Sequence, residues 1–371
     1  MADQLEDVRP PAPTITETLL GHTQEAPTYC FNPALGRDRA RSSILGAALG
    51  DAFGLQVEGD SKETIRDRYP DGLQYPYKGA RRGYPPLDWT DATDFTVLVM
   101  RTLAAYFENR TDNPATELAT HINEWNKTGF PELGDTTGFN APAVVMRALS
   151  SNAFVKNPVD AARSVTGPKA DNGALIRTPP CAFTAAPVGW ALVCSEMTHA
   201  DERCAASAIT LTLLLNQLSR LEVGATISAS VAIGPIAAGR DHIANPARKR
   251  EFMHDLTNTF KLSNIELGER DNRSYTIKTL RCAMWTFRRI ITTAPANRDA
   301  KFFRTVIEQI AAEGGDASAN CAVAGAMLGS IMGVDRLPAD WLEVLPHRNW
   351  LNSEIDAFIA AAEPTWTLAQ R

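Results

Sequence analysis

Residues 277–291 read IKTLRCAMWTFRRII, and this stretch indicates the fold class. Its apolar side chains return every three or four positions: Ile277, Leu280, Met284, Phe287 and Ile291. This spacing places them along one face of an α-helix, because an α-helix has about 3.6 residues per turn. The stretch therefore predicts an amphipathic helix whose apolar face packs into a core.

The same helical spacing recurs along most of the chain. Apolar stripes run through four further segments, residues 95–106, 118–125, 211–218 and 252–260. Alternating patterns typical of β-strands are scarce, and we do not count the short candidates near residues 75–77 as strands. The sequence predicts an all-α fold with one compact domain over residues 37–371. A disordered or extended segment over residues 1–36 is expected to precede it.

Composition and charge narrow the classes of partner. The chain has 371 residues, of which 44% are hydrophobic and 22% charged, and its net charge is −6. No basic stripe is present, so we expect no nucleic-acid partner. No segment approaches the roughly 18 apolar residues of a membrane helix, and the N-terminus has no apolar signal core. We therefore expect a cytoplasmic protein without a membrane partner, with its six cysteines free and buried.

Four segments combine small residues and an acid just before an apolar helix. They are residues 49–54, 89–94, 134–138 and 314–320. Taken singly, each is explained by helix capping, in which Thr90, Asp91 or Asp316 accepts bonds from free N–H groups. Together they gather oxygen donors at helix starts, which is the chemistry that Mg²⁺ prefers. Capping does not require the two glycines before Asp316, which allow the backbone to fold tightly around another group.

Two long polar stretches, residues 60–89 and 164–180, interrupt the helices. Loops of this length in a compact domain are usually functional or disordered. The second stretch contains Asn172, Gly173 and Arg177, and this combination of an amide, a flexible glycine and a cation is typical of a substrate loop. His199, further along, is better interpreted as structural than as catalytic.

The chain resembles the ADP-ribosylglycohydrolase family over residues 42–341. The motifs that carry the resemblance follow the family's order: Gly50-Asp51-Ala52-Phe53-Gly54 with Glu58, Trp89-Thr90-Asp91, Glu132-Leu133-Gly134-Asp135, Asp171-Asn172-Gly173-Ala174-Leu175, Thr198-His199-Ala200-Asp201 and Gly314-Gly315-Asp316. The family fold is a compact all-α domain. Its members use two Mg²⁺ ions to orient ADP-ribose and hydrolyse the bond from its ribose to a side chain or small leaving group. The resemblance implies a glycosyl-hydrolase ancestry, with Thr90, Asp91 and Asp316 as metal ligands and Glu58 as a gating glutamate.

The family's ligand pattern is incomplete in this chain. Ala92 stands at the third position of the first metal cluster, and Ser318 and Ala319 replace a carboxylate and a threonine of the last cluster. The phosphate turn, residues 138–142, is poorer in glycine than the family's, and Pro142 has no N–H to donate. We therefore expect a degenerate metal site without a cofactor, or with one weakly bound Mg²⁺ at most.

Three functions remain open from the sequence, and the first is favoured. It is metal-free acid–base chemistry on a small molecule by the catalytic residues Asp91, Asp316 and Glu58, because carboxyl groups held close together raise one another's pKa. The second is a non-catalytic pseudoenzyme that binds ADP-ribose or a nucleotide. The third is residual Mg²⁺-dependent hydrolysis. The ligand, possibly ADP-ribose-like in the first case, is expected to contact a monomeric protein through Asp51, Gly134, Asp135, Gly138, Asn140, Asn172, Gly173 and Ser318.

Overall fold

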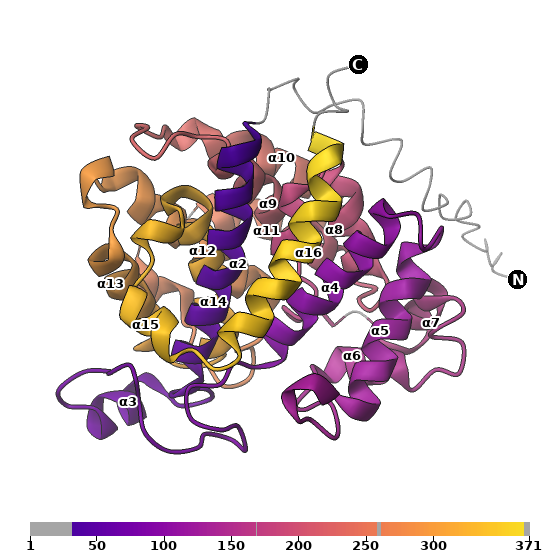
Figure 1. Cartoon of the computed structure of the whole chain (residues 1–371), viewed down its shortest axis with the longest axis horizontal. Helices are drawn as coiled ribbons and strands as arrows, with labels where there is room; N and C mark the ends of the chain where they lie inside the picture. Colours follow the sequence, from indigo (N-terminus) through magenta and orange to yellow (C-terminus); the bar gives the residue numbers. More distant parts are fainter. Residues whose placement is uncertain (1–31, 168, 258–260, 367–371) are drawn as a thin grey trace, which may run out of the picture.

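The structure of the chain is a computed structural model that describes residues 32–167, 169–257 and 261–366. Within these ranges the chain forms the α-helices α2 to α16, short 3-10 turns and isolated bridges, but no β-strand (Figure 1). The all-α prediction is confirmed. Most of the predicted N-terminal segment lies outside the described residues, as do Cys30 and Phe260.

Helix bounds follow the chain from the N-terminal side to the C-terminal side. The first seven helices are α2 (Pro33–Leu55), α3 (Lys62–Arg68), α4 (Asp91–Phe107), α5 (Pro114–Thr128), α6 (Ala143–Leu149), α7 (Pro158–Val165) and α8 (Pro187–Glu196). The remaining helices are α9 (Glu202–Ser219), α10 (Ile233–His242), α11 (Pro246–Thr257), α12 (Thr276–Thr292), α13 (Ala300–Ala311), α14 (Ala317–Met332), α15 (Ala339–Val344) and α16 (Arg348–Trp366).

Helices α2 and α14 form the centre of the bundle and cross at very short range. A Cβ atom added to Gly325 would lie 1.9 Å from the backbone oxygen of Gly46, and one added to Gly329 would lie 2.0 Å from that of Ser42. Ser42 also donates its hydroxyl hydrogen to the Gly329 oxygen at 2.7 Å. Only glycine permits this approach, so small residues fix the distance between the two helices.

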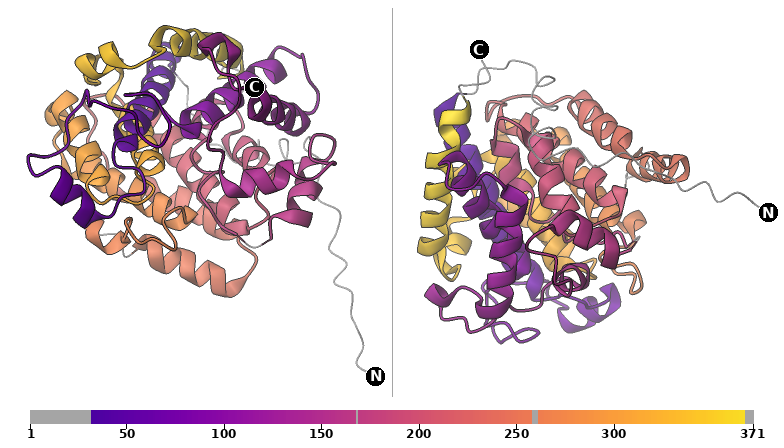
Figure 2. Two further views of the ribbon diagram at one scale, coloured as in Figure 1. Left: turned by 90° about the horizontal axis from the view of Figure 1, so that it is seen from below. Right: turned by 90° about the vertical axis from the view of Figure 1, so that its right-hand side faces the viewer.

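The other long helices cover this central pair. Every residue of α14 is buried, and the predicted stripe of α12 supplies Ile277, Leu280 and Phe287 to the core. Helix α16 packs against α4 and α2, and Figure 2 shows it along one outer side of the bundle. Because the ends of α2, α4 and α14 meet at one place, polar residues at those ends come together there.

The stretch over residues 60–89 contains a helix that the sequence did not predict. Helix α3 buries only Ile65, and so it has no apolar stripe to reveal it. Ser61 begins it by accepting a hydrogen bond from the backbone N–H of Thr64. Further along this stretch Tyr75 forms no strand, and its ring packs 5.0 Å from that of Trp341.

Two predictions from composition can be compared with the described residues. The cysteines within the described part of the chain are free and buried, namely Cys181, Cys194, Cys204, Cys282 and Cys321. Among the described helices, none combines the length and the apolar character needed to cross a membrane. The cysteine prediction is confirmed for these five thiols, and the cellular compartment stays a prediction.

Candidate functional site

A cavity of about 580 Å³ lies where the starts of α4 and α14 meet. Its other walls come from Glu58, which follows α2, and from the segments at residues 140–143, 171–172 and 273–274. Seven residues predicted for the site line it: Glu58, Thr90, Asp91, Asn140, Asn172, Asp316 and Ser318. The structure thus brings together side chains from both ends of the sequence in one acidic, partly enclosed space.

Asp51 does not line this cavity and instead caps the helix that does. The carboxylate is fully buried on α2 and accepts hydrogen bonds from the backbone N–H and the hydroxyl of both Thr90 and Thr93, at 2.7 to 3.1 Å. These bonds satisfy donors at the start of α4, where the helix dipole favours a negative charge. Burial raises the pKa of Asp51 to about 6, although the four bonds oppose the rise. Asp51 therefore positions Thr90 and Asp91 from behind the cavity wall.

Glu58 is held at the start of α14 by the residue that replaces a family carboxylate. One oxygen of Glu58 accepts hydrogen bonds from the backbone N–H of Ser318 at 3.0 Å and from its hydroxyl at 3.1 Å. A carboxylate at position 318 would repel Glu58, whereas a serine donates to it. The departure at Ser318 thus creates the binding position of Glu58.

The two glycines before Asp316 wrap the chain around the segment that carries Glu58. Gly314 and Gly315 both have φ +73°, a conformation that residues with a side chain rarely adopt. Gly59 donates its N–H to the oxygen of Gly315 at 2.7 Å, and Gly315 donates to the oxygen of Asp60 at 2.9 Å. This pairing fixes Glu58 beside Asp316.

Asp316 faces the cavity from the N-cap position of α14. Its carboxylate accepts a hydrogen bond at 3.0 Å from the side-chain amide of Asn172, which also donates to Thr279 at 2.9 Å. Burial raises the pKa of Asp316 to about 6, while the bond from Asn172 and the charge of Arg273 lower it. Burial and the neighbouring Asp316 raise the pKa of Glu58 to about 8. The pair therefore prefers to keep one proton near neutral pH.

Asp91 is the third carboxyl group of the cavity. It begins α4 and is 8% exposed. Burial, followed by the charges of Asp51 and Asp316, raises the pKa of Asp91 well above its usual range. Three carboxyl groups in one cavity therefore disfavour full ionisation, because each negative charge raises the pKa of the others.

Four predicted contact residues lie outside the cavity lining. Gly134 has a left-handed conformation with φ +93°, and Asp135 accepts the backbone N–H of Phe130 at 2.9 Å, so both shape a turn. A Cβ added to Gly138 would lie 2.5 Å from a backbone oxygen of Trp125, so this glycine allows close packing. Gly173 donates its N–H to Asp171 at 3.1 Å. The structure gives these residues roles in the loops behind the cavity.

Asp171 is a lining residue that the predicted contact set lacks. Its carboxylate accepts the N–H of Gly173 and pairs with Nε2 of the buried His199 at 2.5 Å. The charge of His199 and these bonds outweigh burial, which acts the other way, and lower the pKa of Asp171. Only the chain's return at position 199 explains this, and no local pattern reveals it. The structural interpretation of His199 agrees with its place behind Asp171.

Arg177 does not supply a cation to the cavity, contrary to the interpretation of residues 171–177 as a substrate loop. Its guanidinium is fully buried and donates to the backbone oxygen of Cys194 and to the hydroxyl of Thr198. That hydroxyl lies 2.7 Å from Nδ1 of His199. The cation that lines the cavity is Arg273, from a loop that showed no motif.

The fold and the cavity define an all-helical protein with an acidic small-molecule site, and sequence comparison places it more narrowly. The chain belongs to the ADP-ribosylglycohydrolase family, whose family model matches residues 32–368.

Two relatives and one solved structure show how far the similarity extends. The chain is 24% identical over 337 residues to the ADP-ribosyl-(dinitrogen reductase) glycohydrolase of Rhodospirillum rubrum, covering 88% of this chain and 97% of that protein. It is 24% identical over 327 residues to the ADP-ribosylarginine hydrolase Tri1 of Pseudomonas putida, covering 84% and 76%. A solved ADP-ribosylglycohydrolase-related protein complex matches with a TM-score of 0.65 at 22% identity, covering 89% of this chain and 99% of that one. This last likeness supports the fold alone.

Proposed function

We propose that this protein performs metal-independent acid–base chemistry on a small, ADP-ribose-like molecule. The observation that carries the proposal is the contact between Glu58 and Ser318 beside Asp316. It puts two carboxyl groups with different pKa values at the start of one helix. Two such groups can act as a general acid and a general base in the same reaction.

The roles follow from which group holds the proton near neutral pH. Glu58, with a pKa of about 8, is protonated and can donate to a leaving group. Asp316, with a pKa of about 6, is ionised and can accept a proton from water or from a substrate hydroxyl. Asp91 keeps its proton and can donate a hydrogen bond to the bound molecule. In a ribosyl hydrolysis, Glu58 would protonate the departing atom while Asp316 activates the attacking water.

The oxygen donors around the cavity support a reaction without a pair of metal ions. The hydroxyl of Thr90 donates to Asp51 and accepts the N–H of Ala92, while the hydroxyl of Ser318 donates to Glu58. Ala92 and Ala319 offer only methyl groups at the family's ligand positions. Two Mg²⁺ ions need several free carboxylates, because each ion gives up its water reluctantly. This donor set fits two ions poorly.

The substrate class rests on family membership and on the size of the site. The printed names of both relatives describe hydrolases of ADP-ribosyl groups. A cavity of about 580 Å³ is large enough for a ribose and its leaving group. Asn172 and Asn140 line it and supply amide groups that suit sugar hydroxyls.

The test is turnover of ADP-ribose conjugates, including arginine-linked and serine-linked peptides, in Mg²⁺ and in chelator. We expect equal rates in the two conditions, and a fall of about 100-fold in Asp316→Asn and Glu58→Gln. Glu343→Gln, which changes an exposed glutamate of α15, serves as the control. Turnover that chelator abolishes would overturn the proposal. Binding of ADP-ribose without turnover of any conjugate would instead support the pseudoenzyme.

A further inference from the structure

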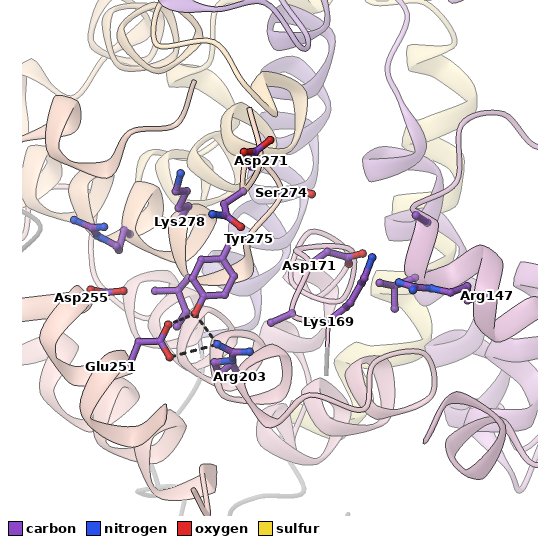
Figure 3. Close-up of a pocket in the computed structure, with 16 residues that line it drawn as sticks. Arg147, Lys169, Asp171, Arg203, Glu251, Asp255, Asp271, Ser274, Tyr275 and Lys278 are labelled. Carbon is purple, nitrogen blue, oxygen red and sulfur yellow. Dashed lines mark hydrogen bonds and ion pairs between the residues drawn. The ribbon is translucent and has the colours of Figure 1, made fainter. Parts of the chain in front are cut away.

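A second cavity of about 670 Å³ adjoins the first, and the acid–base chemistry uses none of its other side chains (Figure 3). The two cavities share Ala143, Asp171 and Ser274 as lining residues. The remaining walls of the second cavity come from α6, α9, α11 and α12 and from the loops at residues 169–171 and 271–275. Because the cavities share a wall, one elongated ligand can occupy both.

One side of the second cavity is already satisfied by internal bonds. The hydroxyl of Tyr275 donates to Glu251 at 2.6 Å, and Arg203 donates to the Tyr275 hydroxyl at 3.1 Å and to Glu251 at 3.3 Å (Figure 3). Lys278 forms an ion pair with Glu269. These charges neutralise each other and leave little capacity for a ligand.

The opposite side carries cations without such partners. Nε and Nη2 of Arg147 are shielded from solvent and have no hydrogen-bond partner among the described residues. For Lys169, the described part of the chain supplies no hydrogen bond or ion pair to the ammonium group. Figure 3 shows Arg147 and Lys169 on the side away from Glu251 and Asp255. An unpaired buried guanidinium is costly, and an anion that accepts bonds from it removes the cost.

We propose that the second cavity binds a phosphate or diphosphate group of the substrate whose reacting end occupies the first cavity. The proposal rests on the proposed function and names the polarity of its substrate. The first cavity is acidic and would repel an anion, whereas Arg147 and Lys169 attract one. The opposite charges of the two cavities therefore orient the ligand, with its phosphate away from Glu58 and Asp316.

The turn before α6 supplies a reason for this use of side chains. Pro142 lines the first cavity and has no N–H, so the backbone there offers one donor fewer to a phosphate. Arg147 lies on α6, which begins directly after this proline. A guanidinium binds phosphate oxygens through two parallel bonds, and a lysine adds a further positive charge. Cationic side chains thus supply the contacts that this turn lacks.

The test is a calorimetric titration with pyrophosphate at constant ionic strength, which requires no turnover. We expect wild-type protein to bind it, and Arg147→Gln and Lys169→Gln each to weaken the affinity by about tenfold or more. Lys156→Gln is the matched control, because Lys156 is exposed and lines neither cavity. We expect its affinity to stay within about twofold of wild type. Because Lys169 is exposed, its substitution is not expected to disturb folding.

Two results would overturn the proposal. One is no saturable binding of pyrophosphate by the wild type, or equal affinities in all four proteins. The other comes from repeating the titrations with ADP-ribose: weaker pyrophosphate binding with unchanged ADP-ribose binding would mean that the cavity takes a free anion. Neither result depends on Glu58 or Asp316, so this proposal and the acid–base proposal can fail separately.

Discussion

Glu58→Gln should make the protein more stable, by an amount that grows with pH. Glutamine is neutral at every pH and can keep both bonds from Ser318, because a single oxygen of Glu58 accepts them. The pKa of Glu58 rises from 4.5 to about 8 on folding. Below the lower value, Glu58 is protonated in both states and costs nothing. As the pH rises to the higher value, the unfolded chain ionises while the folded chain keeps its proton, so stability falls.

The size of this effect follows from the pKa shift. Each pKa unit corresponds to about 1.4 kcal/mol, so the full shift sets an upper limit of about 5 kcal/mol at pH 8. Glu58 retains some contact with solvent and shares its proton preference with Asp316, which reduces the figure. We expect Glu58→Gln to gain about 2 kcal/mol or more over wild type between pH 5 and pH 8.

Urea unfolding of both proteins at pH 5 and pH 8, in chelator, measures this difference. Glu343→Gln removes an exposed carboxylate and should show no comparable gain. An equal stability difference between Glu58→Gln and wild type at the two pH values would refute the reasoning. So would a variant less stable than wild type at pH 8, since this would mean that the ionised carboxylate is stabilised in the folded protein.

Three further predictions concern the helices and the cavity. Gly325→Ala should lose about 3 kcal/mol or more in urea unfolding because its Cβ meets a backbone oxygen at 1.9 Å, whereas Gly234→Ala, with nothing closer than 3.8 Å, should be neutral or stabilising. Asp51→Ala should cost about 3 kcal/mol in thermal unfolding, since four hydrogen bonds to the start of α4 are lost. The plot of kcat/KM against pH should rise near pH 6 and fall near pH 8. Asn172→Ala should move the rising limb to higher pH, because Asp316 loses the bond that lowers its pKa, and an unmoved limb would count against Asp316 as the base.

Helical periodicity was sufficient for the fold because the apolar stripes of the long helices coincide with their buried faces. The stripe at residues 277–291 became the inner face of α12. Periodicity could not find α3, because a seven-residue helix with one buried side chain has no stripe. The close crossing of α2 and α14 depends on backbone atoms at Gly46 and Gly325 that meet only after folding.

The acids of the site could be named from motifs, but their partners could not. Glu58 binds Ser318 across 260 positions of sequence, and His199 pairs with Asp171 across 28. Such contacts depend on how helices pack, and a local motif carries no record of them. The same limit explains Arg177, whose charge suggested a ligand contact although burial among backbone oxygens decides its role.

Calorimetric titration of ADP-ribose into the protein, first in Mg²⁺ and then in chelator, tests the central claim most directly. The account predicts binding with the same affinity in both conditions, because the oxygen atoms of Thr90 and Ser318 are already engaged by protein groups. Binding that requires Mg²⁺ would contradict the claim of metal independence and restore the family's reaction. No binding in either condition would contradict the ADP-ribose-like substrate.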